Sequence, residues 1–255
     1  MKTEIVKITT RDNRFLSGFL VLPAEKFGEE GNIIPWMRDT AVLLLHDLPG
    51  MKKGAADIFT EMQTALAKKG FRSLAFDFSG FGESAERPEH FGPEQICEDI
   101  EDVRLWLKDT VNVEDIAIIA EGLSAKIALD VCDTHVKSFV ALYPLWQTGE
   151  GFSAHGVDLA QYKPSITNEE IEALARSLAD ELPSAESLKI KMPMTIHIGS
   201  DDHRVPVSQA DWAKENINAP RLEVTVYEKG SYGLPQAGIR QMVLHHTAEF
   251  LSKLR

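Results

Sequence analysis

The stretch IAIIAEGLSA, residues 116–125, places an apolar run directly before a short turn and a second apolar segment. A continuous apolar run of this length, rich in β-branched residues, is typical of a strand buried on both faces of a sheet. From Leu123 to Cys132 the apolar residues have helical spacing. The stretch therefore predicts a strand, a sharp turn around Gly122, and a helix.

The same succession of buried strand and helix repeats on both sides of this stretch. A hairpin is predicted first, because residues 4–9 and 15–22 alternate polar and apolar side chains around a turn at 11–13. Further strands are predicted over residues 41–45, 72–76, 137–143, 194–199 and 222–227, and further helices over residues 55–69, 93–108, 208–216 and 238–254. This order predicts a three-layer α/β fold, with a mostly parallel sheet flanked by helices.

Residues 146–192 interrupt the alternation and show no strand pattern. A helix is predicted over residues 167–182, where Thr167 and Glu170 have the spacing of a capping box. An insertion of this length between two sheet strands favours a lid over a site. We therefore expect one α/β domain over residues 1–255, with a helical lid insertion over residues 146–192.

The composition disfavours two classes of macromolecular partner. The chain has 255 residues, 39 of them acidic and 27 basic, which gives a net charge of −12. This charge repels nucleic acid phosphates and anionic lipid headgroups, and no apolar run approaches the roughly 18 residues of a membrane span. We expect neither nucleic acid nor membrane as a partner, and a homodimer stays open.

The cysteines and the N-terminal residues indicate a compartment. Cys97 and Cys132 are far apart and lack the spacing of a metal site, which favours free thiols in a reducing environment. Residues 1–6 lack the apolar run of a signal peptide. These features predict a cytoplasmic protein that needs no metal or cofactor.

Polar motifs follow several of the predicted strands: HDLPG at residues 46–50, DFSGFGES at 77–84 and GSDDHRVP at 199–206. Together with the turn at Gly122, these loops resemble those of the α/β-hydrolase superfamily. HDLPG stands where the family has its oxyanion-hole loop, and GSDDHRVP resembles the loop Gly-x-x-Asp-x-x-Val-Pro of the catalytic acid. The resemblance extends over nearly the whole chain and implies Asp202 as that acid.

The resemblance also implies a nucleophile elbow at the turn of residues 116–125. With Ala120 and Ser124 as the small residues that flank the crowded turn, Gly122 stands at the tip, where the enzymes of the family have serine. A glycine has no side chain to attack a carbonyl, so residue 122 cannot form an acyl intermediate. A shifted alignment makes Ser124 the alternative nucleophile, although it puts Lys126 where a small residue is required.

The positions of the base and of the oxyanion loop depart from the family as well. Tyr232 stands where the family has its histidine, and a phenol with a pKa of about 10 cannot replace imidazole as a base at neutral pH. Asp47 stands where glycine is usual, and its carboxylate would repel a developing oxyanion. Of the triad positions Gly122, Tyr232 and Asp202, only Asp202 keeps its family residue.

The segment AEGLSAKIA, residues 120–128, and the placement of the lid resemble the bacterial luminescence acyl-transferase/thioesterase family. This local likeness implies a long apolar ligand under the lid. The residues expected to contact the ligand are His46, Asp47, Leu48, Glu121, Leu123 and Trp146.

Three functions are compatible with these residues. The first, which the sequence favours, is a pseudoenzyme that binds a small or acyl-like ligand without hydrolysing it. The second is lyase- or isomerase-type acid–base chemistry, set up by a hydrogen bond between Asp202 and Tyr232. The third is ester or thioester hydrolysis through Ser124, with a histidine recruited from elsewhere. The histidines considered are His155, His203 and His245.

Overall fold

The computed structural model describes residues 1–27, 33–34, 36–84, 91–147, 166–180 and 190–253. The strands are β1 (Lys2–Thr9), β2 (Phe15–Leu22), β3 (Lys26–Phe27), β4 (Ile33–Ile34), β5 (Ala41–Leu45), β6 (Ser73–Phe76), β7 (Ile116–Glu121), β8 (Val136–Leu142), β9 (Met194–Gly199) and β10 (Leu222–Tyr227). The helices are η1 (Ala55–Asp57), α1 (Ile58–Lys68), α2 (Pro93–Trp106), η2 (Leu107–Val111), α3 (Gly122–Ile127), α4 (Asn168–Asp180), α5 (Ser208–Asn216) and α6 (Ala237–Ser252).

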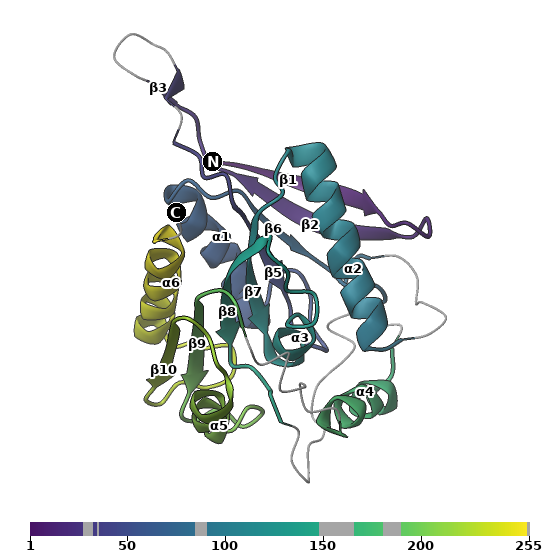
Figure 1. The fold of residues 1–255 in the computed structure, drawn as a ribbon, viewed down its shortest axis with the longest axis vertical. Coiled ribbons are helices and arrows are strands. Elements are labelled where there is room, and N and C mark those ends of the chain that lie inside the picture. Colours follow the sequence, from purple (N-terminus) through teal and green to yellow (C-terminus); the bar gives the residue numbers. More distant parts are fainter. Residues whose placement is uncertain (28–32, 35, 85–90, 148–165, 181–189, 254–255) are drawn as a thin grey trace.

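An eight-stranded sheet runs through the centre of the structure in the order β1-β2-β6-β5-β7-β8-β9-β10 (Figure 1). The pairs from β6 through β5, β7, β8 and β9 to β10 are parallel, and β2 is antiparallel to both β1 and β6. The strands β5 and β7 at the centre are apolar and buried along nearly their whole length, because helices cover both faces of the sheet. The predicted α/β architecture with a mostly parallel sheet is confirmed.

The helices form the two outer layers. The helices α1 and α6 contact each other on one face of the sheet, and α2 and α3 contact each other on the other face (Figure 1). The helix α2 and the adjoining η2 turn an apolar stripe inward, with Ile96, Ile100, Val103 and Leu107 fully buried. Within the described residues, no helix combines the length and the apolar composition that crossing a membrane requires.

Two local predictions need correction. The helix α3 ends at Ile127 and not at Cys132, because the chain continues in tighter turns, with Leu129 N–H bonded to Lys126 O and Asp130 N–H bonded to Ile127 O. In the connection between β2 and β5, where no strand was predicted, the short strands β3 and β4 pair antiparallel.

The lid prediction falls largely on residues 148–165 and 181–189, which lie outside the described residues. Of the insertion at 146–192, the structure describes the helix α4. Its capping box is present: Thr167 Oγ1 accepts the Glu170 N–H at 3.3 Å, and Glu170 Oε2 accepts the Thr167 N–H at 2.8 Å.

Candidate functional site

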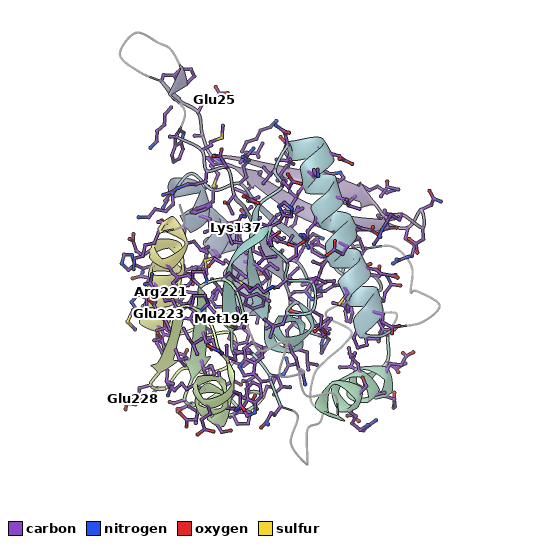
Figure 2. The ribbon with its side chains drawn as sticks, in the orientation of Figure 1. Glu25, Lys137, Met194, Arg221, Glu223 and Glu228 are labelled. Atoms are coloured by element: carbon purple, nitrogen blue, oxygen red, sulfur yellow. The ribbon has the colours of Figure 1, made fainter. Side chains whose placement is uncertain are left out.

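Loops from six strands meet at one end of the sheet. Because parallel strands point the same way, the loops after β5, β6, β7, β8, β9 and β10 leave the sheet at their common carboxyl ends. In Figure 2, Glu228 marks this end, just past β10, and Lys137 near the start of β8 marks the opposite end. The triad positions implied by the sequence all lie in these loops.

The strand β7 passes into α3 through a turn at Gly122. Gly122 has φ +50°, in the left-handed region that glycine adopts without strain. A Cβ atom added to Gly122 would overlap the carboxylate of Asp47. The predicted sequence of strand, sharp turn and helix is therefore present, and Asp47 occupies the space in front of the turn.

Asp47 is 3% exposed and lies among four hydrogen-bonding or charged groups. Its Oδ1 accepts the backbone N–H groups of Leu48 and Leu123, each at 2.8 Å. Its Oδ2 accepts the Tyr232 hydroxyl at 2.7 Å and lies 3.2 Å from Nη2 of Arg204. One carboxylate therefore joins the loops that follow β5, β7, β9 and β10.

The hydroxyl of Tyr232 donates its hydrogen bond to Asp47. The prediction of a hydrogen bond between Tyr232 and Asp202 is therefore wrong. The Arg204 guanidinium lies 4.3 Å from the centre of the Tyr232 ring, and the Tyr143 ring packs edge-on against it. Burial and the neighbouring charge of Asp47 raise the pKa of Tyr232 well above its ordinary value. Tyr232 therefore acts as a hydrogen-bond donor that positions Asp47.

Asp202 lies in the loop after β9, as its motif predicted. Its Oδ1 accepts the backbone N–H groups of Arg204 and Val205, at 2.8 and 2.9 Å. Its Oδ2 is buried and has no hydrogen-bond partner among the described residues. Burial raises the pKa of this carboxyl. Asp202 thus retains an acceptor atom that the rest of the described site does not satisfy.

Glu121, the last residue of β7, is fully buried beneath the site. It accepts the Tyr143 hydroxyl, the Ala55 N–H at 3.0 Å and the Asp47 N–H at 3.2 Å. Burial raises the pKa of Glu121 to about 7; the Tyr143 hydrogen bond lowers it, and the Asp47 charge raises it. Glu121 therefore changes its charge near neutral pH while fully enclosed.

His46 is fully buried and connects two loops. Its Nε2 accepts the Phe78 N–H at 3.1 Å, so the ring proton lies on Nδ1, which donates to Asp47 O at 2.7 Å. Burial lowers the pKa of His46, and the ring stays neutral. Both nitrogens are thus used within the protein.

Ser124 lies inside α3 and is fully buried. Its hydroxyl is within hydrogen-bond distance of two carbonyl oxygens, Glu121 O at 2.7 Å and Leu45 O at 3.2 Å. No histidine in the described part of the chain is hydrogen-bonded to Ser124; His203 and His245 are exposed, and His155 lies outside the described residues. Among its described residues, the structure therefore brings no histidine to the alternative nucleophile.

The remaining expected ligand contacts, Leu48, Leu123 and Trp146, are buried close to the same turn or just past β8. Trp146 is held by α5, where Gln209 Oε1 accepts the Trp146 and Gln147 N–H groups at 2.8 and 3.0 Å. The indole Nε1 of Trp146 is buried and has no partner among the described residues.

Sequence reasoning missed three residues of the site: Tyr143, Arg204 and Gln209. Tyr143 and Arg204 were detectable in principle, because Tyr143 directly follows β8 and Arg204 stands inside the motif of Asp202. Gln209 gave no signal, because its role depends on the packing of α5 against residues 146–147.

Although Asp47, Glu121 and Asp202 share this end of the sheet, the described residues contain no group of His, Cys, Asp or Glu side chains suited to a metal ion.

The chain matches a known protein family. Residues 40–158 match the family model for the alpha/beta hydrolase fold, and this span includes β5, the turn at Gly122 and β8. With the sheet order and the loops described above, the chain has the α/β-hydrolase fold. No curated protein sequence matches it.

Solved structures of similar fold include several esterases. The chain is 22% identical to an esterase of Pyrococcus furiosus, over 99% of this chain and 91% of that one, with a TM-score of 0.72. It is 14% identical to an esterase of Exiguobacterium antarcticum, over 97% and 99% of the two chains, with a TM-score of 0.72. Est1E of Butyrivibrio proteoclasticus, solved with ferulic acid bound, is 14% identical over 98% and 99%, with a TM-score of 0.74. At these identities the likeness establishes the fold.

Proposed function

We propose that this protein is a non-hydrolytic member of the superfamily that binds a small or acyl-like ligand at the carboxyl end of the sheet. In this proposal Gly122 and Tyr232 stand at the nucleophile and base positions and perform no acyl transfer. The insertion at residues 146–192 covers the ligand as a lid. The partly buried free thiols of Cys97 and Cys132 support a cytoplasmic location.

The observation that carries the proposal is the position of the Asp47 carboxylate. In hydrolases of this fold, the oxyanion hole consists of the N–H of the residue after the nucleophile and an N–H from the loop after an earlier strand. The Leu123 and Leu48 N–H groups correspond to these donors, and both bind Asp47 Oδ1 at 2.8 Å. Donors already satisfied by a carboxylate do not stabilise the oxyanion of an ester intermediate.

Two unsatisfied polar atoms support ligand binding at this end of the sheet. Trp146 Nε1 is a donor and Asp202 Oδ2 an acceptor, and both are buried without a partner in the described structure. They follow the neighbouring strands β8 and β9. Because leaving a buried polar atom unpaired costs about 1–3 kcal/mol, a ligand that pairs with these atoms gains affinity from them.

Activity-based labelling tests the absence of hydrolysis. We expect a fluorophosphonate probe to leave the native protein unlabelled, while an active serine esterase in the same mixture is labelled. The Ser124→Ala variant serves as the matched blank. Labelling of the native protein that disappears in Ser124→Ala would establish a serine hydrolase and refute the proposal.

Native mass spectrometry of the purified protein tests ligand binding. We expect a co-purifying small molecule whose occupancy falls in the Trp146→Phe variant, because phenylalanine keeps an aromatic ring but lacks the N–H donor. Trp212→Phe is the control, since Trp212 of α5 stacks on Trp146 and provides a second indole beside it. Equal occupancy in both variants, or consistently ligand-free protein, would contradict the proposal.

Acid–base catalysis at the same position is the second candidate, and Glu121 is the observation that favours it. A carboxyl with a pKa of about 7 can both accept and donate a proton at neutral pH. Incubation of the co-purified compound with the protein in D₂O tests this function. Deuterium incorporation that Glu121→Gln abolishes would favour catalysis, and its absence would favour binding alone.

A further inference from the structure

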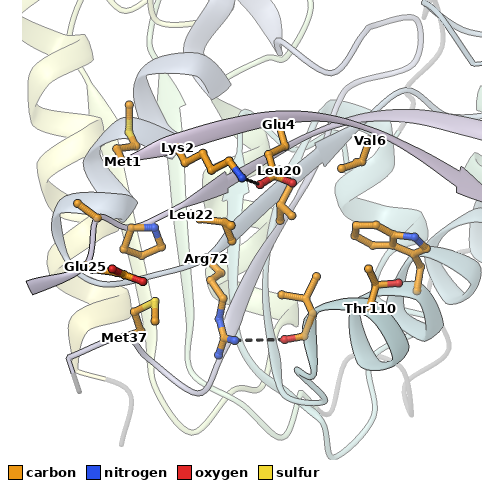
Figure 3. A pocket seen from close by; sticks show the side chains of 14 residues that line it. Met1, Lys2, Glu4, Val6, Leu20, Leu22, Glu25, Met37, Arg72 and Thr110 are labelled. Atoms are coloured by element: carbon orange, nitrogen blue, oxygen red, sulfur yellow. Dashed lines mark hydrogen bonds and ion pairs between the residues drawn. The ribbon is translucent and has the colours of Figure 1, made fainter. Parts of the chain in front are cut away.

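A cavity of about 680 Å³ lies at the end of the sheet opposite to the candidate site (Figure 3). It is bordered by the start of β1, the end of β2, Arg72 just before β6, and the end of α2 with η2. Its volume is within the range of about 300–1,000 Å³ of small-molecule sites. None of its lining residues belongs to the loops that carry Asp47 and Gly122.

One wall of this cavity is apolar. Leu20 and Leu22 of β2 and Trp106 of α2 line it, together with Val6 and Val111. All of these side chains belong to the hydrophobic core or pack against it, so the core fixes the shape of the wall. The wall can accommodate a hydrocarbon chain, whose burial is favourable.

Arg72 supplies a positive charge to the cavity. Its Nη1 donates to Val111 O at 3.3 Å and its Nη2 to Arg38 O at 2.9 Å (Figure 3 shows the first bond). Its Nε is buried without an acceptor, and no carboxylate in the described part of the chain lies within ion-pair distance of the guanidinium. Burial lowers the pKa of Arg72, and the more distant Asp39 raises it.

Charged side chains other than Arg72 also line the cavity: Lys2, Glu4 and Glu25. Lys2 is paired with Glu4 at 2.6 Å, and Figure 3 shows this pair on the far side of the cavity from Arg72. Glu25 adds one carboxylate to the lining. A guanidinium has five N–H donors, of which the two carbonyls use only part, and its fork matches a carboxylate.

We propose that this cavity binds an amphipathic carboxylic acid, whose carboxylate pairs with Arg72 and whose hydrocarbon chain lies against Leu22 and Trp106. A monoanion fits better than a phosphate dianion, because the carboxylates of Glu4 and Glu25 also line the cavity. The site is separate from the one at Asp47, so either can exist without the other.

Decanoate is the probe, and decanol is its uncharged counterpart. We expect decanoate to shift the indole ¹⁵N–H resonance of Trp106 and to bind at least about tenfold more tightly than decanol, because a charge-assisted hydrogen bond accounts for such a difference. Isothermal titration calorimetry gives the affinities. Equal affinities, or a Trp106 resonance that does not move, would overturn the proposal.

Three variants test whether decanoate binds in this cavity, so that the test does not depend on a single substitution. Thr110→Trp places a large side chain at an exposed lining position and should abolish the Trp106 shift. Glu25→Gln removes a nearby negative charge and should tighten decanoate binding severalfold without affecting decanol. Arg72→Gln should reduce the preference for decanoate to near unity. If Thr110→Trp and Glu25→Gln both leave decanoate affinity unchanged, the cavity is not the binding site.

Discussion

At the scale of single residues, Asp47 and Gly122 depend on each other. Gly122→Ser should lower the free energy of unfolding by about 3 kcal/mol, because the new side chain has positive φ and overlaps the Asp47 carboxylate. In an Asp47→Gly background, the same substitution should cost at least about 1 kcal/mol less. Urea denaturation of the two single variants, the double variant and the native protein measures this coupling.

Gly233 provides the control for this cycle. It also has a positive φ, +75°, but a side chain there would meet Ala55 and not Asp47. Gly233→Ser should therefore be destabilising by the same amount with or without Asp47. If the costs at residues 47 and 122 simply add, Asp47 does not fill the space in front of the turn.

Glu121 should make stability depend on pH. Its pKa is about 7 in the folded protein against an ordinary 4.5, so between these values the unfolded chain releases a proton that the folded protein keeps. The stability of the native protein relative to Glu121→Gln should therefore be highest below pH 4.5 and fall by on the order of 3 kcal/mol as the pH rises to 7. Denaturation of both proteins across this range measures the difference.

The comparison with Glu121→Gln isolates this residue. Burial also raises the pKa of Asp99 to about 6, but Asp99 is present in both proteins and its effect cancels. A difference in stability that stays constant from pH 4 to pH 8 would show that the pKa of Glu121 is not raised in the folded protein.

At the scale of elements, Gln209 of α5 holds residues 146 and 147, in the connection that follows β8, by hydrogen bonds. Gln209→Leu leaves the Trp146 and Gln147 N–H groups without their acceptor, so their hydrogen exchange should accelerate about tenfold or more. Gln209→Glu keeps an acceptor and should preserve the protection. Unchanged exchange in Gln209→Leu would mean that residues 146–147 are held by other contacts.

The elements themselves could be predicted from the sequence, since strands such as 194–199 and 222–227 are continuous apolar or alternating runs between turn residues. The end of α3 could not, because it depends on turns that close behind Ile127. In the site, the motifs placed Gly122, Asp202 and Tyr232 in the correct loops. The predicted hydrogen-bond partner of Tyr232, Asp202, was wrong, because the direction of a side chain between two loops is set by tertiary packing.

At the scale of the whole molecule, the net charge of −12 bears on the choice of macromolecular partner. We expect no retention on heparin and no binding to phosphatidylserine vesicles at 50 mM NaCl, because both surfaces are anionic. A matched run with a basic protein of similar size establishes that the column and the vesicles are active. Retention that disappears with added salt would reveal a basic patch and contradict the expectation.

The carboxylate of Asp47 also bears on how such a chain could evolve a nucleophile. A single change of Gly122 to serine creates a hydroxyl in space that is already filled, and removal of Asp47 alone frees the two backbone donors without supplying anything to attack a substrate. Neither step brings a catalytic benefit that selection could retain. If the protein is non-hydrolytic as proposed, an acyl intermediate on residue 122 therefore requires at least two substitutions, across an intermediate sequence with no gain in function.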